Sequence, residues 1–188
     1  PLEKVFPTET PSVEKKLYPK LEYKERPAVK HASVKIASPK VVIPVFPGTN
    51  CEYDTEKAFR LAGASPVTII LRNMNSNTLD ESLEELSKEI STAQILMLPG
   101  GFSGGDEPDG SGKFITAVLR NEKIHESIES LLCKNDGLIL GICNGFQALV
   151  KSGLLPYGRI KPVMSPDDPT LTHNTIYRHQ STMVTTRI

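Results

Sequence analysis

From residue 40 onward, short apolar runs alternate with amphipathic stretches, and this alternation limits the possible folds more than any other feature of the sequence. The apolar runs at residues 41–46, 67–72, 93–99 and 137–142 predict buried strands. The stretches at residues 52–64, 78–91, 110–135 and 144–153 predict helices. Consecutive parallel strands need helical crossovers, which cover both faces of the sheet. We therefore expect an α/β fold with a three-layer, doubly wound, mostly parallel sheet.

The stretch at residues 78–91 is the clearest helix. Thr78 and Glu81 have the spacing of a capping box, so we expect the helix to begin at Thr78. Its apolar residues recur at intervals of three and four and form one stripe, which consists of Leu79, Leu83, Leu86 and Ile90. Gly153 is expected to end the last helix, at residues 144–153.

The first 40 residues differ in composition from the rest of the chain. They are rich in proline, contain no glycine and have more basic than acidic side chains. Proline without glycine is typical of a semi-rigid extended connector, so we expect a linker at 1–40 and a partial α/β domain at 41–188. The alternatives are a disordered tail and a linker that lies on a neighbouring domain, with contacts through Leu17, Tyr18, Leu21 and Tyr23.

Composition excludes several classes of partner. Lys plus Arg and Asp plus Glu both total 22, so the net charge is zero, and nothing favours nucleic acid or an anionic membrane as a partner. No run reaches the roughly 18 apolar residues of a membrane span, and the first residues lack the apolar core of a signal peptide. Cys51, Cys133 and Cys143 are too few and too widely spaced for a disulfide framework or a metal site. Free thiols predict a cytoplasmic location.

Cys143 lies between two glycines, where the fourth apolar run meets the last helix. Gly141, Cys143 and Gly145 have the Gly-X-Cys-X-Gly spacing of a nucleophile elbow. A sharp turn there exposes Sγ at the carboxyl edge of the sheet, in front of the free N–H groups of the helix, which favour the thiolate. A structural cysteine buried in an apolar strand is the alternative interpretation of an isolated motif of this kind.

The turn at residues 99–101, Pro-Gly-Gly, supports the interpretation as a nucleophile. A thiolate that attacks a carbonyl group needs N–H donors for the developing oxyanion. The backbone N–H groups of Asn144 and Gly101 are the candidates. Cys51 also follows a strand but lacks flanking glycines, so we expect it to be a neighbour of the site, whereas Cys133 is expected in the core.

The glycine-rich segment that follows this turn is acidic. Its carboxylates are Asp106, Glu107 and Asp109. We expect these carboxylates to face solvent or an interface, which is the usual environment of such side chains. The alternative is that they bind the amino group of a ligand.

Three segments together resemble a known family: FPGTNCEYD, LPGGFSGGDEPDGSGKF and LGICNGFQALVKSGLLP. They are similar, in the same order, to the glutaminase domains of phosphoribosylformylglycinamidine synthases, which are class I, triad-type glutamine amidotransferases with a flavodoxin-like fold. The resemblance covers about residues 41–160. It implies that Cys143 attacks the amide of glutamine, that Gly101 and Asn144 form the oxyanion hole, and that Gln147 and Phe102 hold the substrate.

The resemblance also implies a partner. The ammonia passes to a synthetase domain of the same chain, which uses ATP and Mg²⁺ to amidate formylglycinamide ribonucleotide. No cofactor or metal ion is expected in the glutaminase segment itself.

The sequence departs from the family pattern at two places. Gly104 stands where many members have tyrosine, which suggests a long, fused form of the enzyme. The family's catalytic His-x-Glu pair has no counterpart: none of the four histidines, His31, His125, His173 and His179, has Glu two positions later. His173 and His179 are expected at the surface near a strand, and His125 within a helix on the wrong side of the sheet.

We therefore expect a C-terminally truncated glutaminase domain without turnover of its own. Two other functions stay open from the residues alone. One is a stand-alone thiol hydrolase or chaperone-like protein of the same broad fold, and the other is a non-catalytic interaction domain.

Overall fold

The computed structural model describes residues 35–104, 112–171, 174, 176 and 178–183. The chain divides into two units, one formed by residues 32–172 and one formed by residues 1–31 with 173–188. The described residues of the second unit form neither helix nor strand. The predicted connector before residue 35, the acidic carboxylates at 106–109, His31 and His173 lie outside the described residues.

The larger unit is built on a sheet of four parallel strands. In chain order the strands are β1 (Lys40–Val45), β2 (Ser65–Ile70), β3 (Ile95–Leu98) and β4 (Leu138–Gly141). Their order across the sheet is β2-β1-β3-β4, and every neighbouring pair is parallel. The predicted parallel sheet is therefore confirmed, although β2 begins two residues before the predicted position. All four strands end at the same edge of the sheet, so the loops that follow them meet there.

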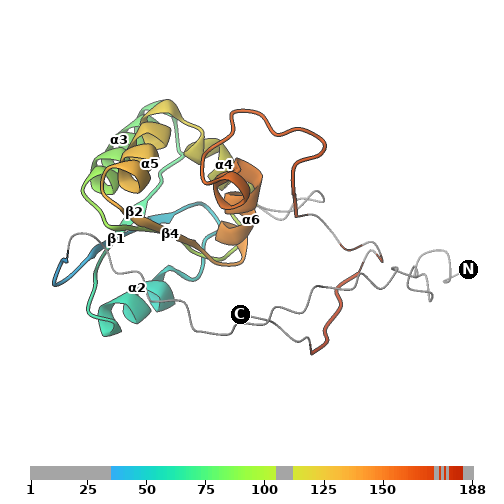
Figure 1. Cartoon of the computed structure of the whole chain (residues 1–188), viewed down its shortest axis with the longest axis horizontal. Coiled ribbons are helices and arrows are strands. Elements are labelled where there is room, and N and C mark those ends of the chain that lie inside the picture. The colour runs from blue at the N-terminus through green and yellow to red at the C-terminus, as the bar shows by residue number, and fades with distance from the viewer. Residues whose placement is uncertain (1–34, 105–111, 172–173, 175, 177, 184–188) are drawn as a thin grey trace, which may run out of the picture. The chain divides into compact units, whose positions relative to one another are not determined.

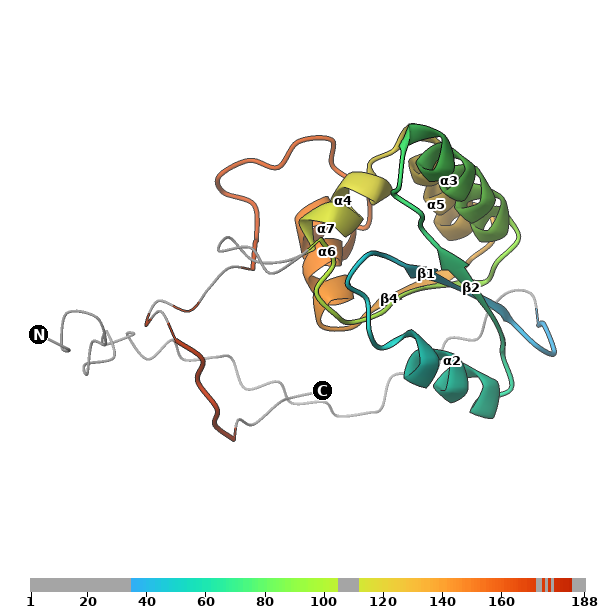
Figure 2. The same ribbon diagram turned by 180° about the vertical axis from the view of Figure 1, so that it is seen from behind.

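Helices cover both faces of this sheet. They are α2 (Glu52–Leu61), α3 (Ser76–Ser91), α4 (Lys113–Leu119), α5 (Glu122–Cys133), α6 (Asn144–Ser152) and α7 (Leu154–Tyr157). The helix α2 lies on one face, and α3, α5, α4 and α6 lie on the other, as both views show (Figures 1 and 2). The three layers predicted from the sequence are thus present. Within the described residues, every helix falls short of the length and apolarity that crossing a lipid bilayer requires.

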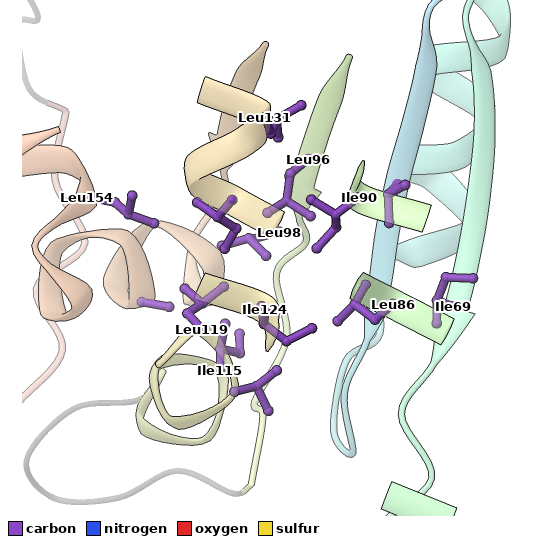
Figure 3. Close-up of a cluster of buried hydrophobic side chains, with 14 of the residues drawn as sticks. Ile69, Leu86, Ile90, Leu96, Leu98, Ile115, Leu119, Ile124, Leu131 and Leu154 are labelled. Carbon is purple, nitrogen blue, oxygen red and sulfur yellow. The ribbon is translucent and has the colours of Figure 1, made fainter. Parts of the chain in front are cut away.

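Two apolar clusters correspond to the two faces. Successive strand residues point to opposite sides, so Val42 of β1 packs into the larger cluster, with residues of α3, α4, α5 and α6. Figure 3 shows part of this cluster, including Leu86 of α3 and Ile124 of α5. Val41 and Ile43 point the other way and pack with Met97 against Phe59 of α2. The larger cluster holds the sheet against four helices and fixes the orientation of the elements that surround the strand ends.

The helix α3 begins earlier than the sequence predicts. Asn75 is its N-cap: Asn75 Oδ1 accepts from Thr78 N at 3.0 Å, and Thr78 Oγ1 accepts from Asn75 N at 3.2 Å. The expected start at Thr78 is therefore wrong, because Thr78 is the third helical residue and Glu81 instead pairs with Arg72. The predicted apolar stripe is confirmed, since three of its members are buried and Leu79 packs against them.

The predicted long helix at residues 110–135 is two helices. The first, α4, ends at Leu119, and Asn121 begins the second as its N-cap, accepting from Lys123 N at 3.1 Å. The helical pattern continues through this point, but the chain breaks here because the side chain of Asn121 accepts from the free N–H group of Lys123 at the start of the second helix. Cys133 at the end of α5 is exposed, so the prediction that it belongs to the core is wrong. Gly153 ends α6 with φ +90°, as predicted.

Candidate active site

Three loops meet at the carboxyl edge of the sheet, and backbone hydrogen bonds join them. Phe102 N donates to Gly48 O at 2.9 Å, and Gly104 N donates to Pro47 O at the same distance, so the loop after β3 is fixed to the loop after β1. Ile142 N donates to Leu98 O at 3.1 Å, which extends the pairing of β3 and β4 into the next turn. These bonds hold the three predicted site segments together.

Cys143 occupies the sharp turn between β4 and α6. Its backbone has φ +51° and ψ −106°, in a region that side-chain-bearing residues rarely adopt, and it is the N-cap of α6. A conformation of this kind costs on the order of 1–3 kcal/mol and tends to mark functional turns. The side chain is exposed, so the interpretation of Cys143 as a buried structural cysteine is wrong. The turn predicted from the glycine spacing is present.

Each glycine of the motif has a steric reason. A Cβ on Gly145 would lie 2.1 Å from Leu98 O, and a Cβ on Gly141 would lie 2.7 Å from Gly145 O. Both distances are far below van der Waals contact with backbone atoms that cannot move alone. Only glycine at these two positions lets α6 start directly against β3 and β4, which presents Cys143 at the edge of the sheet.

The two predicted oxyanion donors belong to the loops that border Cys143. Gly101 has φ +136°, and a Cβ there would lie 2.7 Å from Gly48 O. A Cβ on the preceding residue, Gly100, would lie 3.4 Å from Cys143 Cβ, so this loop passes directly beside the cysteine. Within the part of the chain that the structure describes, the N–H groups of Gly101 and Asn144 donate to no acceptor. The assignment of these two groups to an oxyanion hole stays a prediction.

The side chain of Asn144 ties the loop after β3 to the start of α6. Asn144 is buried, and its Oδ1 accepts from Ser103 Oγ at 2.6 Å and from Ser103 N at 3.1 Å. Sequence reasoning assigned Asn144 a role through its backbone alone and missed Ser103. The one signal in the sequence was a serine within a glycine-rich loop, and its partner 41 positions away gives no local pattern.

The predicted substrate-binding residues lie on either side of Cys143. Gln147 is half-buried one helical turn after it, and Gln147 N donates to Cys143 O at 3.0 Å. Gln147 Oε1 accepts from Asn144 Nδ2 at 3.3 Å. Phe102 is 53% exposed on the loop after β3.

A hollow of about 690 Å³ lies between α4 and residues 162–170, and its wall includes none of the predicted site residues.

Cys51 is a neighbour of Cys143, as expected. It is the N-cap of α2, its Sγ donates to Asn50 Oδ1 at 3.1 Å, and it is exposed. In the larger unit, His125 of α5 faces Glu129 with 3.4 Å between Nε2 and Oε1. His179 belongs to the other unit and is exposed there. Among the described residues, no histidine is hydrogen-bonded to Cys143, and no three side chains of His, Cys, Asp or Glu form a group that could hold a metal ion.

Comparison with known proteins agrees with this geometry. The family model described as the CobB/CobQ-like glutamine amidotransferase domain matches residues 38–188. The chain is 39% identical over 138 residues to the phosphoribosylformylglycinamidine synthase subunit PurQ of Dehalococcoides mccartyi, covering 72% of this chain and 47% of that protein. It is 36% identical over 139 residues to PurQ of Archaeoglobus fulgidus, covering 72% and 48%. The chain thus spans about half the length of the curated relatives it matches.

One solved structure is also similar. In the structure of PurLQS from Thermotoga maritima, the matching chain is 31% identical, with a TM-score of 0.41 and coverage of 62% of this chain and 45% of that chain.

Proposed function

The chain belongs to the CobB/CobQ-like glutamine amidotransferase domain family, and on that premise we propose that it is the glutaminase part of a phosphoribosylformylglycinamidine synthase. It releases ammonia from glutamine, and the ammonia serves the amidation of formylglycinamide ribonucleotide in purine biosynthesis. The names of the relatives support the pathway. The strained, exposed Cys143 at the N-terminus of α6 is the observation that supports the chemistry.

In the proposed reaction, the Cys143 thiolate attacks the side-chain amide carbon of glutamine. A C–S bond forms, and the carbonyl electrons move to oxygen, where the N–H groups of Gly101 and Asn144 stabilise the negative charge. When this intermediate collapses, the C–N bond breaks and ammonia leaves with an added proton. Water then attacks the thioester, which gives glutamate and restores the thiol. Gln147 and Phe102 hold the glutamine beside the sulfur.

The reaction needs a group that protonates the leaving ammonia and then activates water. In the resembled family a His-x-Glu pair does this, and no His-x-Glu sequence occurs in these 188 residues. Loss of such a pair typically reduces turnover on the order of 10⁴-fold, although oxyanion and binding contributions persist. We therefore expect these residues to form the covalent adduct but not to turn over glutamine at a steady rate.

The proposal includes a synthetase partner in the same enzyme. ATP and Mg²⁺ belong to the amidation step on that partner, and the glutaminase site at Cys143 uses neither. The substrate of this site is free glutamine.

A covalent probe tests the proposal. The purified chain is treated with a diazoketone analogue of glutamine, and the adduct is located by peptide mass spectrometry. We expect one adduct per chain, on Cys143, and none in Cys143→Ala. Cys133→Ala is the matched control, because Cys133 is an exposed thiol outside the site, and it should label like the parent.

Protection distinguishes the substrate. L-Glutamine should slow the labelling in a saturable manner, whereas L-asparagine, which is one methylene shorter, should not. Labelling shared among all three thiols, or equal protection by the two amino acids, would contradict a glutaminase site at Cys143.

A further inference from the structure

Two thiols, not one, lie at the carboxyl edge of the sheet, and only a glycine lies between them. A Cβ on Gly100 would be 3.5 Å from Cys51 Sγ and 3.4 Å from Cys143 Cβ. These two cysteine atoms are therefore no farther apart than the sum of the two distances, about 7 Å. The backbone of Gly100 does not itself require glycine, since its φ lies outside the left-handed region. The missing side chain leaves room for one methyl group at ordinary contact distance from Cys51 Sγ and Cys143 Cβ.

We propose that Cys51 and Cys143 form a reversible disulfide under oxidation, and that this bridge switches the nucleophile off. The bridge follows from the geometry alone, whereas its consequence for catalysis rests on the proposed function. Both side chains are exposed, so a small oxidant reaches them. A disulfide needs about 3.5–4.5 Å between the two Cβ atoms, so the proposed closure includes a small shift of the loops that carry the two cysteines. Rotation about the Cα–Cβ bonds then turns the two sulfurs toward each other.

The surrounding contacts favour a bridge over loss of the fold. The backbone of Cys51 is anchored, because its carbonyl oxygen accepts from Thr55 N at 3.1 Å and from Thr55 Oγ1 at 2.7 Å. Its Sγ, in contrast, makes a single hydrogen bond, to Asn50 Oδ1. Among the described residues, Cys143 Sγ makes none. The anchored carbonyl of Cys51 keeps the start of α2 in place, so a shift of the turn at Cys143 and rotation of the two side chains bring the thiols together without unfolding.

Each of the two cysteines is also the N-cap of a helix, Cys51 of α2 and Cys143 of α6, without a side-chain hydrogen bond to cap it. Free N–H groups at a helix N-terminus favour negative charge nearby. Both sulfurs therefore lie at the start of a helix, with no cap bond that ties either of them to it.

With a peroxide as oxidant, the electrons balance in two steps. The Cys143 thiolate attacks a peroxide oxygen, an S–O bond forms, the O–O bond breaks and hydroxide leaves. The Cys51 thiolate then attacks the Cys143 sulfur, the S–S bond forms and the S–O bond breaks, again with loss of hydroxide. Overall two thiols are oxidised and one hydrogen peroxide is reduced to two waters. A dithiol reductant reverses the change by thiol–disulfide exchange.

The experiment uses the full chain with Cys133→Ser, so that only the two site thiols remain. After titration with hydrogen peroxide, intact-mass and peptide analysis should show an intramolecular link between Cys51 and Cys143. Labelling of Cys143 by the diazoketone should fall in proportion to the link, and dithiothreitol should restore both. Peroxide that leaves Cys143 as a sulfenic or sulfinic acid with no link to Cys51 would overturn the proposal.

Two variants separate the bridge from a general sensitivity to oxidation. In Cys51→Ser, peroxide should inactivate Cys143 without any link, and dithiothreitol should not reverse the more oxidised product. In Gly100→Ala the new methyl group stands at ordinary contact distance from both Cys51 Sγ and Cys143 Cβ, and bridging should slow on the order of tenfold. Bridging at the parental rate in Gly100→Ala contradicts the proposed path.

The outcomes for the two proposals are distinct. If the bridge forms but the reduced chain is not labelled by the diazoketone, the redox proposal is supported and the proposed glutaminase function is contradicted. Labelling of the reduced chain without a bridge keeps the glutaminase and removes the switch.

Discussion

At the scale of single residues, the site depends on backbone conformation more than on side-chain chemistry. Cys143 adopts a positive φ because Ile142 on one side is bonded to Leu98 and the first turn of α6 on the other side begins immediately. The flanking glycines allow the approach that makes this turn possible. The sharp turn at Cys143 and its glycines were predictable from the sequence because the motif is local, whereas the role of Cys143 as a nucleophile stays a prediction. Ser103 was not, because the partner of that hydroxyl is distant in sequence.

Ser103→Ala tests the tie between the loop after β3 and α6. The change removes the 2.6 Å hydrogen bond to Asn144 Oδ1 and should lower the free energy of unfolding by about 1–2 kcal/mol. It should also slow diazoketone labelling of Cys143, because the loop with the Gly101 donor loses a buried anchor. Urea denaturation and labelling rates measure the two effects.

Ser127→Ala is the matched control for Ser103→Ala. Ser127 is a comparably buried serine whose Oγ bonds to Ser87 Oγ at 2.6 Å between α5 and α3, away from the loops of the site. It should lose a similar amount of stability and keep the parental labelling rate. Equal slowing in both variants would mean that stability alone, and not the position of the loop, governs the reactivity of Cys143.

At the scale of elements, hydrophobic periodicity predicted which segments are helices and strands, but side-chain caps decided where they begin. Asn75 starts α3 and Asn121 separates α4 from α5, and both positions are polar residues that a periodic pattern treats as neutral. Cys133 is exposed because it lies outside the buried stripe of α5, which includes Ile124, Ile128 and Leu131. The apolar stripe of α3 was predictable, because the residues that recur at helical spacing in the sequence are also the residues that are buried in the structure.

The segment after α7 contains a polar cluster centred on Asp168. The Lys161 ammonium at 2.6 Å, the Tyr157 hydroxyl and the backbone N–H of Ser165 all donate to this carboxylate and hold the pKa of Asp168 well below its ordinary value. The hydrogen bond from the Tyr157 hydroxyl to Asp168 raises the pKa of Tyr157 above its usual value.

Because the pKa of Asp168 is lower in the folded than in the unfolded chain, the cluster stabilises the fold above the ordinary Asp value, and this contribution is lost as the pH falls below about 4. Asp168→Asn should therefore be less stable than the parent at pH 7, and the difference should shrink as the pH is lowered from about 4. Denaturant unfolding of both proteins across that range measures it. A difference that is constant with pH would show that the amide disturbs packing and that the charge is unimportant.

At the scale of the whole molecule, the site is assembled from loops that follow three different strands. The topological rule that parallel strands end at one edge was enough to predict this meeting of Cys51, Gly101 and Cys143 from the sequence. The hydrogen bonds and close backbone approaches that join the loops were not predictable, because they depend on tertiary register. The boundary near residue 40 stays a prediction from composition.

Limited proteolysis tests that boundary. The α/β unit buries its backbone in a sheet and two apolar clusters, so cleavage within residues 41–160 should be slow. We expect the first cuts N-terminal to residue 40, identified by N-terminal sequencing or mass spectrometry of the resistant fragment. Uniform resistance from the first residue onward would mean that residues 1–40 are docked and that the predicted linker is wrong.

The close approach of Gly145 to the Leu98 carbonyl has a consequence for the biogenesis of the protein. The turn at Cys143 rests on the pairing of β3 and β4, so we expect a nascent or unfolded chain to contain an ordinary, unstrained thiol at this position. On the proposed function, the reactivity of Cys143 should arrive together with the native sheet and disappear when the sheet melts. Pulsed labelling of Cys143 during refolding would accordingly report the folded fraction from within the native sequence, with no reporter group introduced.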